Sequence, residues 1–370
     1  MNKKKLLKIL FQKPDVILFI VTLALCACGL TLIQSASQTP MRDGIVQGVA
    51  MVMGLIVTTV LTWIDYDYFR ALWPFAAGAS AFFLVLVLLI GIGGEEVGTT
   101  GWISLGPVSL QPSELAKIGF IITFSCHLNH VRARVSEFKH FMLLMLHFGA
   151  YAGLVLLQPD FGTAMVFAVI ALGMLFIAGL DWRYFLAMGI LLPITAVGGY
   201  FFLLKDYQKK RIFTFLNPES DPTGSGYHVL QSKIAIGSGQ LTGNGYKNGP
   251  ITQNGLLPAA KTDFVFGALG EEFGFFACIL LLFLLFFMIW RVFHAAMNAK
   301  DSFGELLCVG VGAMLSFHVI ENVGMCIGLL PVTGIPLPLI SHGGSNVLAT
   351  MMALGIVQSV VVHRRVVHFQ

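Results

Sequence analysis

Apolar residues occur in long runs along this chain, and short polar segments separate the runs. A helix that crosses the hydrocarbon core of a bilayer needs about 20 residues, and on that length the pattern predicts ten spans. They cover residues 16–35, 45–64, 71–92, 113–130, 141–157, 161–180, 184–204, 264–290, 303–329 and 343–362. We therefore expect an all-α polytopic membrane protein with a single transmembrane domain over residues 1–370.

The composition supports this interpretation. Of the 370 residues 56% are hydrophobic and 11% are charged, whereas soluble domains carry about 25% charged residues. Charged side chains are costly in hydrocarbon, so each one inside an apolar segment becomes a functional candidate. The six cysteines lie in apolar stretches without the paired spacing of a zinc site or disulfide framework, and we interpret them as packing residues.

Basic residues are distributed unevenly between the segments that join the spans. The N-terminal tail and every second short loop carry them, whereas the opposite short loops contain only Arg42. Because Lys and Arg accumulate on the cytoplasmic side, we expect both termini to be cytoplasmic. The same bias explains the net charge of +4, which therefore does not indicate nucleic acid as a partner. The apolar run after Lys13 lacks a convincing cleavage site, so the first helix is expected to be retained.

Three external segments stand out from this pattern: residues 93–112, 205–263 and 330–345. In the long segment 205–263, Tyr227, Leu230 and Ile234 recur at helical spacing and predict a short amphipathic helix at the outer leaflet. Segment 330–345 is apolar but broken by Pro and Gly. Its backbone polar groups need protein or water partners at membrane depth, which a re-entrant segment lining a cavity provides.

The ionisable residues at the span that begins near residue 113 allow two interpretations. Ser113 fits a helix N-cap, and Glu114 and Lys117 are spaced for an ion pair. Alternatively, Lys117 meets a diphosphate that enters from the outer leaflet. Asp160 also precedes a span, and we interpret it chiefly as the cap of that helix.

Asp263 lies where the polar segment 205–263 enters a long apolar helix, close to water. A carboxylate in this position can be reached by a substrate hydroxyl and tuned by partial burial; a helix cap is the alternative. Glu271 and Glu272 follow within three turns and are interpreted as packing or supporting residues. His342 is interpreted as a hydrogen-bonded loop histidine.

Four segments resemble the shape, elongation, division and sporulation (SEDS) family, over almost the full chain. They are Gln-Pro-Ser-Glu-Leu-Ala-Lys at 111–117, Gln-Pro-Asp-Phe-Gly-Thr at 158–163, Lys-Thr-Asp-Phe-Val-Phe at 261–266 and Gly-Leu-Leu-Pro-Val-Thr-Gly-Ile-Pro-Leu-Pro-Leu-Ile-Ser at 328–341. Segments 206–222 and 226–239 are more similar to the RodA-like elongation members than to the FtsW-like division members. The chain departs from the family pattern at Ala259, Lys261 and His342, where Glu, His and Tyr are frequent.

The resemblance implies a peptidoglycan glycosyltransferase of the bacterial plasma (inner) membrane that polymerises lipid II and releases undecaprenyl diphosphate. The implied partners are a class B penicillin-binding protein transpeptidase, elongation-complex membrane proteins and membrane lipids. The essential aspartate of the family corresponds to Asp263. Candidate substrate-binding residues are Glu114, Lys117, Asp160, Arg211, Lys233 and Ser341.

Two questions stay open at this point. The negative charge that develops in the reaction needs a cation, which Arg211, Lys117 or a divalent ion (Mg²⁺ or Mn²⁺) would supply; no other cofactor is indicated. A polar cavity with buried acids serves transport equally well, so a lipid II flippase is the main rival, followed by a division-type paralogue and a non-catalytic scaffold.

Overall fold

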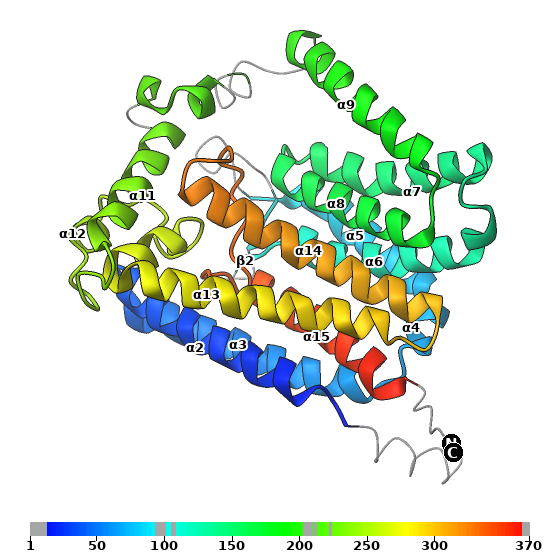
Figure 1. The fold of residues 1–370 in the computed structure, drawn as a ribbon, viewed down its shortest axis with the longest axis horizontal. Coiled ribbons are helices and arrows are strands. Elements are labelled where there is room, and N and C mark those ends of the chain that lie inside the picture. Colours follow the sequence, from blue (N-terminus) through cyan, green and yellow to red (C-terminus); the bar gives the residue numbers. More distant parts are fainter. Residues whose placement is uncertain are drawn as a thin grey trace.

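The computed structural model describes residues 13–92, 101–104, 109–202, 209, 213–221 and 224–364. Within these residues, ten helices of 18 residues or more form one bundle (Figure 1). They are α2 (Val16–Ala36), α3 (Pro40–Trp63), α5 (Trp73–Ile90), α6 (Pro112–Val131), α7 (Phe138–Leu156), α8 (Phe161–Ala178), α9 (Trp182–Phe202), α13 (Val265–Met297), α14 (Ser302–Cys326) and α15 (Gly344–His363). Each corresponds to one predicted span. Eight of the ten are long and apolar enough to cross a membrane by length and composition. The other two are α6 and α9.

Shorter elements connect these helices. They are α4 (Asp67–Ala71), the 3₁₀ helices η1 (Arg132–Arg134) and η2 (Pro218–Ser220), α11 (Ser225–Gly239), α12 (Pro250–Gln253) and the strands β1 (Ile103–Ser104) and β2 (Ser109–Leu110). The two strands pair antiparallel, with Ile103 opposite Leu110. This small hairpin is a minor departure from the predicted all-α fold. The long segment 205–263 contains η2, α11 and α12, so it is ordered over these stretches, as expected.

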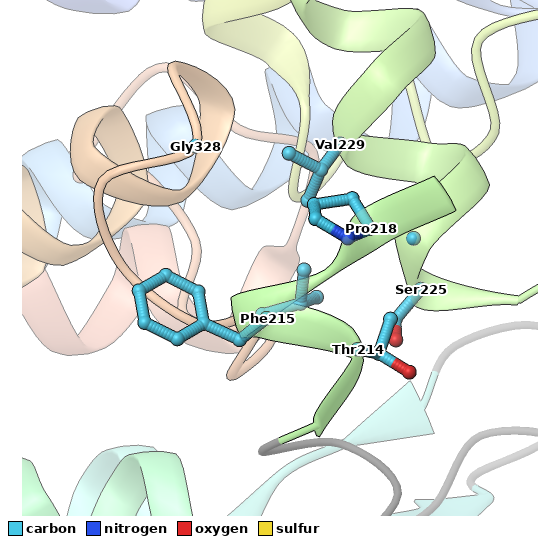
Figure 2. A pocket seen from close by; sticks show the side chains of 8 residues that line it. Thr214, Phe215, Pro218, Ser225, Val229 and Gly328 are labelled. Atoms are coloured by element: carbon cyan, nitrogen blue, oxygen red, sulfur yellow. The ribbon is translucent and has the colours of Figure 1, made fainter. Parts of the chain in front are cut away.

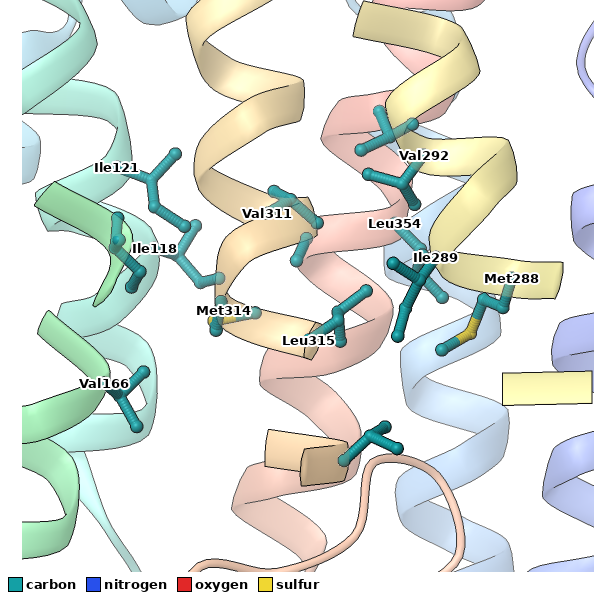
Figure 3. Packing of buried hydrophobic residues seen from close by; sticks show 14 of the residues in the cluster. Ile118, Ile121, Val166, Met288, Ile289, Val292, Val311, Met314, Leu315 and Leu354 are labelled. Carbon is teal, nitrogen blue, oxygen red and sulfur yellow. The ribbon is translucent and has the colours of Figure 1, made fainter. Parts of the chain in front are cut away.

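The core of the bundle is built around α14. Figure 3 shows Val311, Met314 and Leu315 of α14 between side chains of α6 on one side and of α13 on the other. The helices approach closely because Gly310 faces Ile121: a Cβ at position 310 would lie 2.9 Å from a methyl group of Ile121. Small residues allow such close helix packing where the hydrophobic effect cannot drive it. In contrast, α9 lies at the margin of the bundle (Figure 1).

Ion pairs gather at one end of the bundle. They are Asp15–Arg291, Arg70–Asp301, Arg132–Glu305 and Asp67–Lys300. The first and last spans meet here too, since the side chain of Gln358 bonds the backbone N–H and C=O of Asp15, each at 2.8 Å. These basic residues are among those that the charge pattern assigns to the cytoplasm. The basic residues predicted to be cytoplasmic that form these pairs therefore lie at the same end of the bundle.

The long helix α13 is interrupted, which corrects the prediction of one regular span over 264–290. Gly274 has φ 72° and ψ −171°, and a Cβ there would lie 2.3 Å from the backbone nitrogen of Gly243. Residues 240–245 occupy the break: the N–H of Phe275 donates to the C=O of Gln240 at 2.8 Å, and that of Asn244 to the C=O of Glu271 at 3.0 Å. The break thus fastens the external segment to α13.

Helix α11 confirms the predicted helix, but its packing face differs from the apolar stripe. Ile234 is 52% exposed, whereas Ser232 is fully buried and donates a hydrogen bond to the C=O of Cys326 at 2.9 Å. The reason is distance: a Cβ at Gly239 would lie 1.9 Å from the C=O oxygen of Gly270 in α13. Small residues such as Ser232 and Gly239 occupy the closest part of this interface, and Ile234 faces outward.

The orientation of the bundle can be tested by labelling two exposed positions at opposite ends, Asn248 and Ala133. We expect Asn248→Cys to react in intact cells with a membrane-impermeant maleimide, and Ala133→Cys to react only after the membrane is permeabilised. The unsubstituted chain is the control, because four of its six cysteines are buried. Labelling of both positions from the same side would refute the predicted topology.

Candidate functional site

The carboxylate of Asp263 has no partner among the described residues. Helix α13 begins with Phe264 as its N-cap, and no side chain caps it, so the alternative role of Asp263 as a cap does not hold. The side chain is partly exposed and faces Gly334 of the segment before α15: a Cβ at Gly334 would lie 3.7 Å from Asp263 Oδ2. Asp263 is thus a free carboxylate at the end of the bundle opposite the ion pairs.

The backbone around Asp263 is held by residues far away in the sequence. Asn322 Nδ2 donates to the C=O of Asp263 at 2.8 Å and to that of Ile335 at 2.9 Å. Ser341 Oγ donates to the C=O of Thr262 at 2.6 Å and accepts from the N–H of Leu337 at 2.9 Å. Segment 330–345 is non-helical up to its last two residues, and these bonds give its backbone the protein partners that the prediction required.

The surroundings of Asp263 change its acidity. Burial raises the pKa of the Asp263 carboxyl to about 6, because the charged form loses solvation. A carboxylate with this pKa is still ionised at neutral pH, yet it is a stronger base than an ordinary aspartate. Both properties suit a general base.

Glu114 and Lys117 form a buried ion pair, as their spacing predicts, with Nζ and Oε1 2.8 Å apart. Lys117 Nζ also lies 3.0 Å from His318 Nε2, and Asn346 Nδ2 donates to Glu114 Oε2 at 3.1 Å. The predicted cap is wrong: Gln111 is the N-cap and Pro112 takes the first helical position, which leaves Ser113 inside the helix.

Three further polar atoms of this cluster, Ser113 Oγ, His318 Nδ1 and Asn346 Oδ1, are buried without a hydrogen-bond partner among the described residues. Buried polar atoms normally have a protein or water partner. Their concentration around one ion pair marks a polar interior that suits water or a polar ligand.

Asp160 caps α8, as predicted. Its carboxylate accepts from the N–H of Thr163 at 2.9 Å and from Thr163 Oγ1 at 2.7 Å. Burial raises the pKa of Asp160, and the bonds from Thr163 and the charge of Lys117 oppose that shift. Asp160 therefore belongs to the same polar cluster as Lys117, although its oxygens already serve the helix.

Segment 330–345 links this cluster to Asp263. Thr333 Oγ1 donates to Glu321 Oε1 at 2.7 Å, and a Cβ at Gly162, at the start of α8, would lie 2.9 Å from the C=O oxygen of Thr333. The next residue, Gly334, faces Asp263. Segment 330–345 thus contacts both the start of α8, which Asp160 caps, and the Asp263 carboxylate.

The remaining candidate residues are Ser341, Lys233 and Arg211. Ser341 is fully buried and uses its hydroxyl on the backbone. Lys233 is exposed on α11, and its Nζ is 3.7 Å from where a Cβ would stand at Gly328. Arg211 lies outside the described residues.

Glu271 and Glu272 are structural, as interpreted from the sequence. Glu271 accepts from Thr252 Oγ1 at 2.5 Å and from two N–H groups of α12, those of Ile251 and Thr252. Glu272 accepts from Ser35 Oγ at 2.6 Å and from Gln253 Nε2 at 2.8 Å. The pair thus attaches α12 to α13 and α2.

A mostly apolar pocket lies between η2, α11 and the segment that follows α14 (Figure 2). It is lined by Thr214, Phe215, Pro218, Ser225, Gly226, Val229, Gly328 and Val332. Gly328 and Val332 belong to the same connection as Gly334, so the pocket lies next to the Asp263 site along the chain. Sequence reasoning missed it, because its walls come from three segments that meet only in the folded chain.

Sequence reasoning also missed neutral polar residues of the apolar spans. His318 and Asn322 in α14 and Asn346 in α15 are buried, and the signal for them was the cost of any polar group in hydrocarbon. No group of three His, Cys, Asp or Glu side chains in the described ranges is arranged to hold a metal ion.

These features define a polytopic helical membrane protein with a polar site at one end of the bundle. The chain belongs to the family of cell cycle proteins FtsW, RodA and SpoVE, whose family model matches residues 15–366.

Similar proteins cover nearly the whole chain. The peptidoglycan glycosyltransferase MrdB of Escherichia coli (strain K12) is 35% identical over 367 residues, which is 98% of this chain and 97% of MrdB. The stage V sporulation protein E of Bacillus subtilis (strain 168) is 34% identical, over 94% and 96% of the two chains.

Solved structures of similar proteins have the same fold over nearly the whole chain. A chain from a structure described as "Structural coordination of polymerization and crosslinking by a peptidoglycan synthase complex" has a TM-score of 0.84 and 31% identity, over 95% of this chain and 98% of that one. The rod shape determining protein RodA of Thermus thermophilus has a TM-score of 0.72 and 28% identity, over 96% and 98%.

The buried ion pair makes a stability prediction. Lys117→Met leaves the Glu114 carboxylate buried without its cation, and removal of one partner of a buried pair costs about 3–5 kcal/mol. Arg132→Met is the matched control, since it breaks the half-exposed pair with Glu305 and should cost at most about 1 kcal/mol. Thermal unfolding in detergent measures both. Equal unfolding temperatures for the two variants would contradict the assignment.

Proposed function

We propose that this protein is a peptidoglycan glycosyltransferase that polymerises lipid II, with Asp263 as its general base. The observation that carries the proposal is the Asp263 carboxylate, which is free of partners among the described residues, partly exposed, and raised in pKa. The names of relatives that span the whole chain give the reaction class.

In the proposed reaction, Asp263 accepts the proton of the sugar 4-hydroxyl of one lipid II molecule. The hydroxyl oxygen forms a bond to the anomeric carbon of the diphosphate-linked strand. The bond from that carbon to the diphosphate oxygen breaks, and undecaprenyl diphosphate leaves with the bonding electrons. The proton on Asp263 then passes to water.

The charge on the leaving diphosphate needs a cation. Lys117 is already paired with Glu114, which favours a role in shaping the polar interior over direct contact. Lys233 is exposed next to Gly328, which lines the pocket, and has no partner among the described residues, so it is our preferred protein cation. Arg211 and a Mg²⁺ or Mn²⁺ ion held chiefly by the diphosphate are the further proposed sources.

The finer assignment is to the elongation-type, RodA-like branch, in the bacterial inner membrane. The motif stretches 206–222 and 226–239 support this branch. We also propose a class B penicillin-binding protein as partner, since the structure with a TM-score of 0.84 is of a peptidoglycan synthase complex.

Asp263→Asn tests the proposal directly. The amide keeps the size of the side chain but cannot take the hydroxyl proton, so polymerisation of purified lipid II should fall by about a hundredfold or more. Asp301→Asn is the control: Asp301 caps α14 and pairs with Arg70 at the other end of the bundle, so its loss should affect stability rather than turnover. Gel analysis of glycan products measures the rate, with the partner protein present.

Two results would overturn the proposal. Near wild-type polymerisation by Asp263→Asn would remove Asp263 as the base. Leaflet exchange of lipid II by the wild-type protein, with no glycan product, would favour the flippase.

The raised pKa of Asp263 predicts the pH dependence of the reaction. The base works in its ionised form, so kcat/KM should be constant well above pH 6 and should fall about tenfold per pH unit below that value. Initial rates between pH 4.5 and 8, with protein stability checked at each pH, measure this profile. A profile that stays flat to about pH 5 would show that a group with an ordinary carboxyl pKa, or no protein base, controls the rate.

A further inference from the structure

Two of the three positions at which the chain departs from the family pattern, Lys261 and His342, meet at one acidic side chain, that of Asp43 in α3. Lys261 Nζ is bonded to Asp43 Oδ2, and His342 Nε2 lies 3.8 Å from Asp43 Oδ1. The two residues also contact each other through the backbone, where the N–H of His342 donates to the C=O of Lys261 at 2.8 Å. Asp43 had not been singled out in the sequence.

The same face of α3 makes a second attachment one turn further along. Gln47 is fully buried; its Nε2 donates to the C=O of Ser341 at 3.2 Å, and its Oε1 accepts from the N–H of Gly343 at 3.2 Å. Asp43 and Gln47 are four residues apart and therefore face the same way. Helix α3 thus contacts both the segment before α15 and the residue two positions before Asp263.

We propose that Asp43 is a positioning residue for the polymerase reaction: by binding Lys261, with His342 beside it, it fixes the segment that carries Asp263. This inference rests on the proposed function. Asn322 and Ser341 hold the carbonyl groups of Asp263 and Thr262 from the side of α14 and α15, and Asp43 supplies the restraint from α3. A base must be held close to its productive position, since a misplacement of about 1 Å can cost a hundredfold in rate.

The exposure of the pair separates positioning from stability. The Lys261 side chain is 34% exposed, whereas that of Asp43 is 11% exposed, so Lys261 lies at the rim of the bundle and its replacement removes little packing. Asp43 also accepts from Ser37 Oγ at 2.5 Å and Thr39 Oγ1 at 3.3 Å. These hydroxyls keep its carboxylate oriented when Lys261 is replaced.

The test uses the full-length protein with its partner and lipid II. Asp43→Asn and Lys261→Met should each lower kcat about tenfold and leave KM within about twofold, because the base is displaced while the substrate contacts remain. The double variant should be no slower than either single, since both remove one interaction. Lys261→Arg should retain most of the activity. Lys300→Met, which removes a similarly exposed lysine from its pair with Asp67 at the other end of the bundle, is the control and should leave kcat unchanged.

Hydrogen exchange and unfolding temperature complete the test. In both single variants the amides of residues 259–264 and 337–343 should exchange faster, with an unchanged unfolding temperature. Unchanged kcat in the singles, additive losses in the double, or a kcat loss that follows a fall in unfolding temperature would each overturn the positioning role while the wild-type protein still polymerises. If the wild-type complex makes no glycan, the proposed function is wrong and this inference falls with it.

Discussion

The side-chain amide of Asn322 is the contact on which the site depends. Two irregular segments meet at this end of the bundle, and their carbonyl groups cannot be left without partners in a water-poor environment. Asn322 belongs to the central helix α14 and donates to one carbonyl from each segment, those of Asp263 and Ile335. The most buried part of the bundle thereby holds the least regular part of the chain in place.

A comparison of the buried and half-buried carboxylates separates structural from chemical roles. Those with partners include Asp15, Asp43, Glu114, Asp160, Glu271, Glu272 and Glu321, which accept bonds from lysine, arginine, hydroxyl, amide or backbone N–H groups. Asp263 has none among the described residues. A carboxylate that is desolvated without compensation is costly, and such groups concentrate at functional sites.

The sequence was sufficient for the spans, because a run of about 20 apolar residues has few alternatives to a membrane helix. It was also sufficient for the pairing of Glu114 with Lys117, which one helical turn brings together. It was insufficient for contacts between distant segments. Nothing local indicates that Asp43 meets Lys261, or that Ser232 rather than Ile234 is buried. The break at Gly274 was missed for the same reason, since residues 240–245 replace its helical bonds.

Asp160 and Asp263 show why sequence alone left open whether Asp263 was a helix cap. Each precedes a long apolar helix, and each was therefore a possible cap. Both oxygens of the Asp160 carboxylate accept hydrogen bonds from Thr163. The helix after Asp263, in contrast, has Phe264 as its N-cap and no side-chain cap. Asp263 is instead positioned through its backbone, by Asn322 at its own carbonyl and by its neighbours Thr262 and Lys261. A group held in this way is fixed in space while its side chain keeps both oxygens available, which is the combination that proton transfer to a substrate oxygen requires.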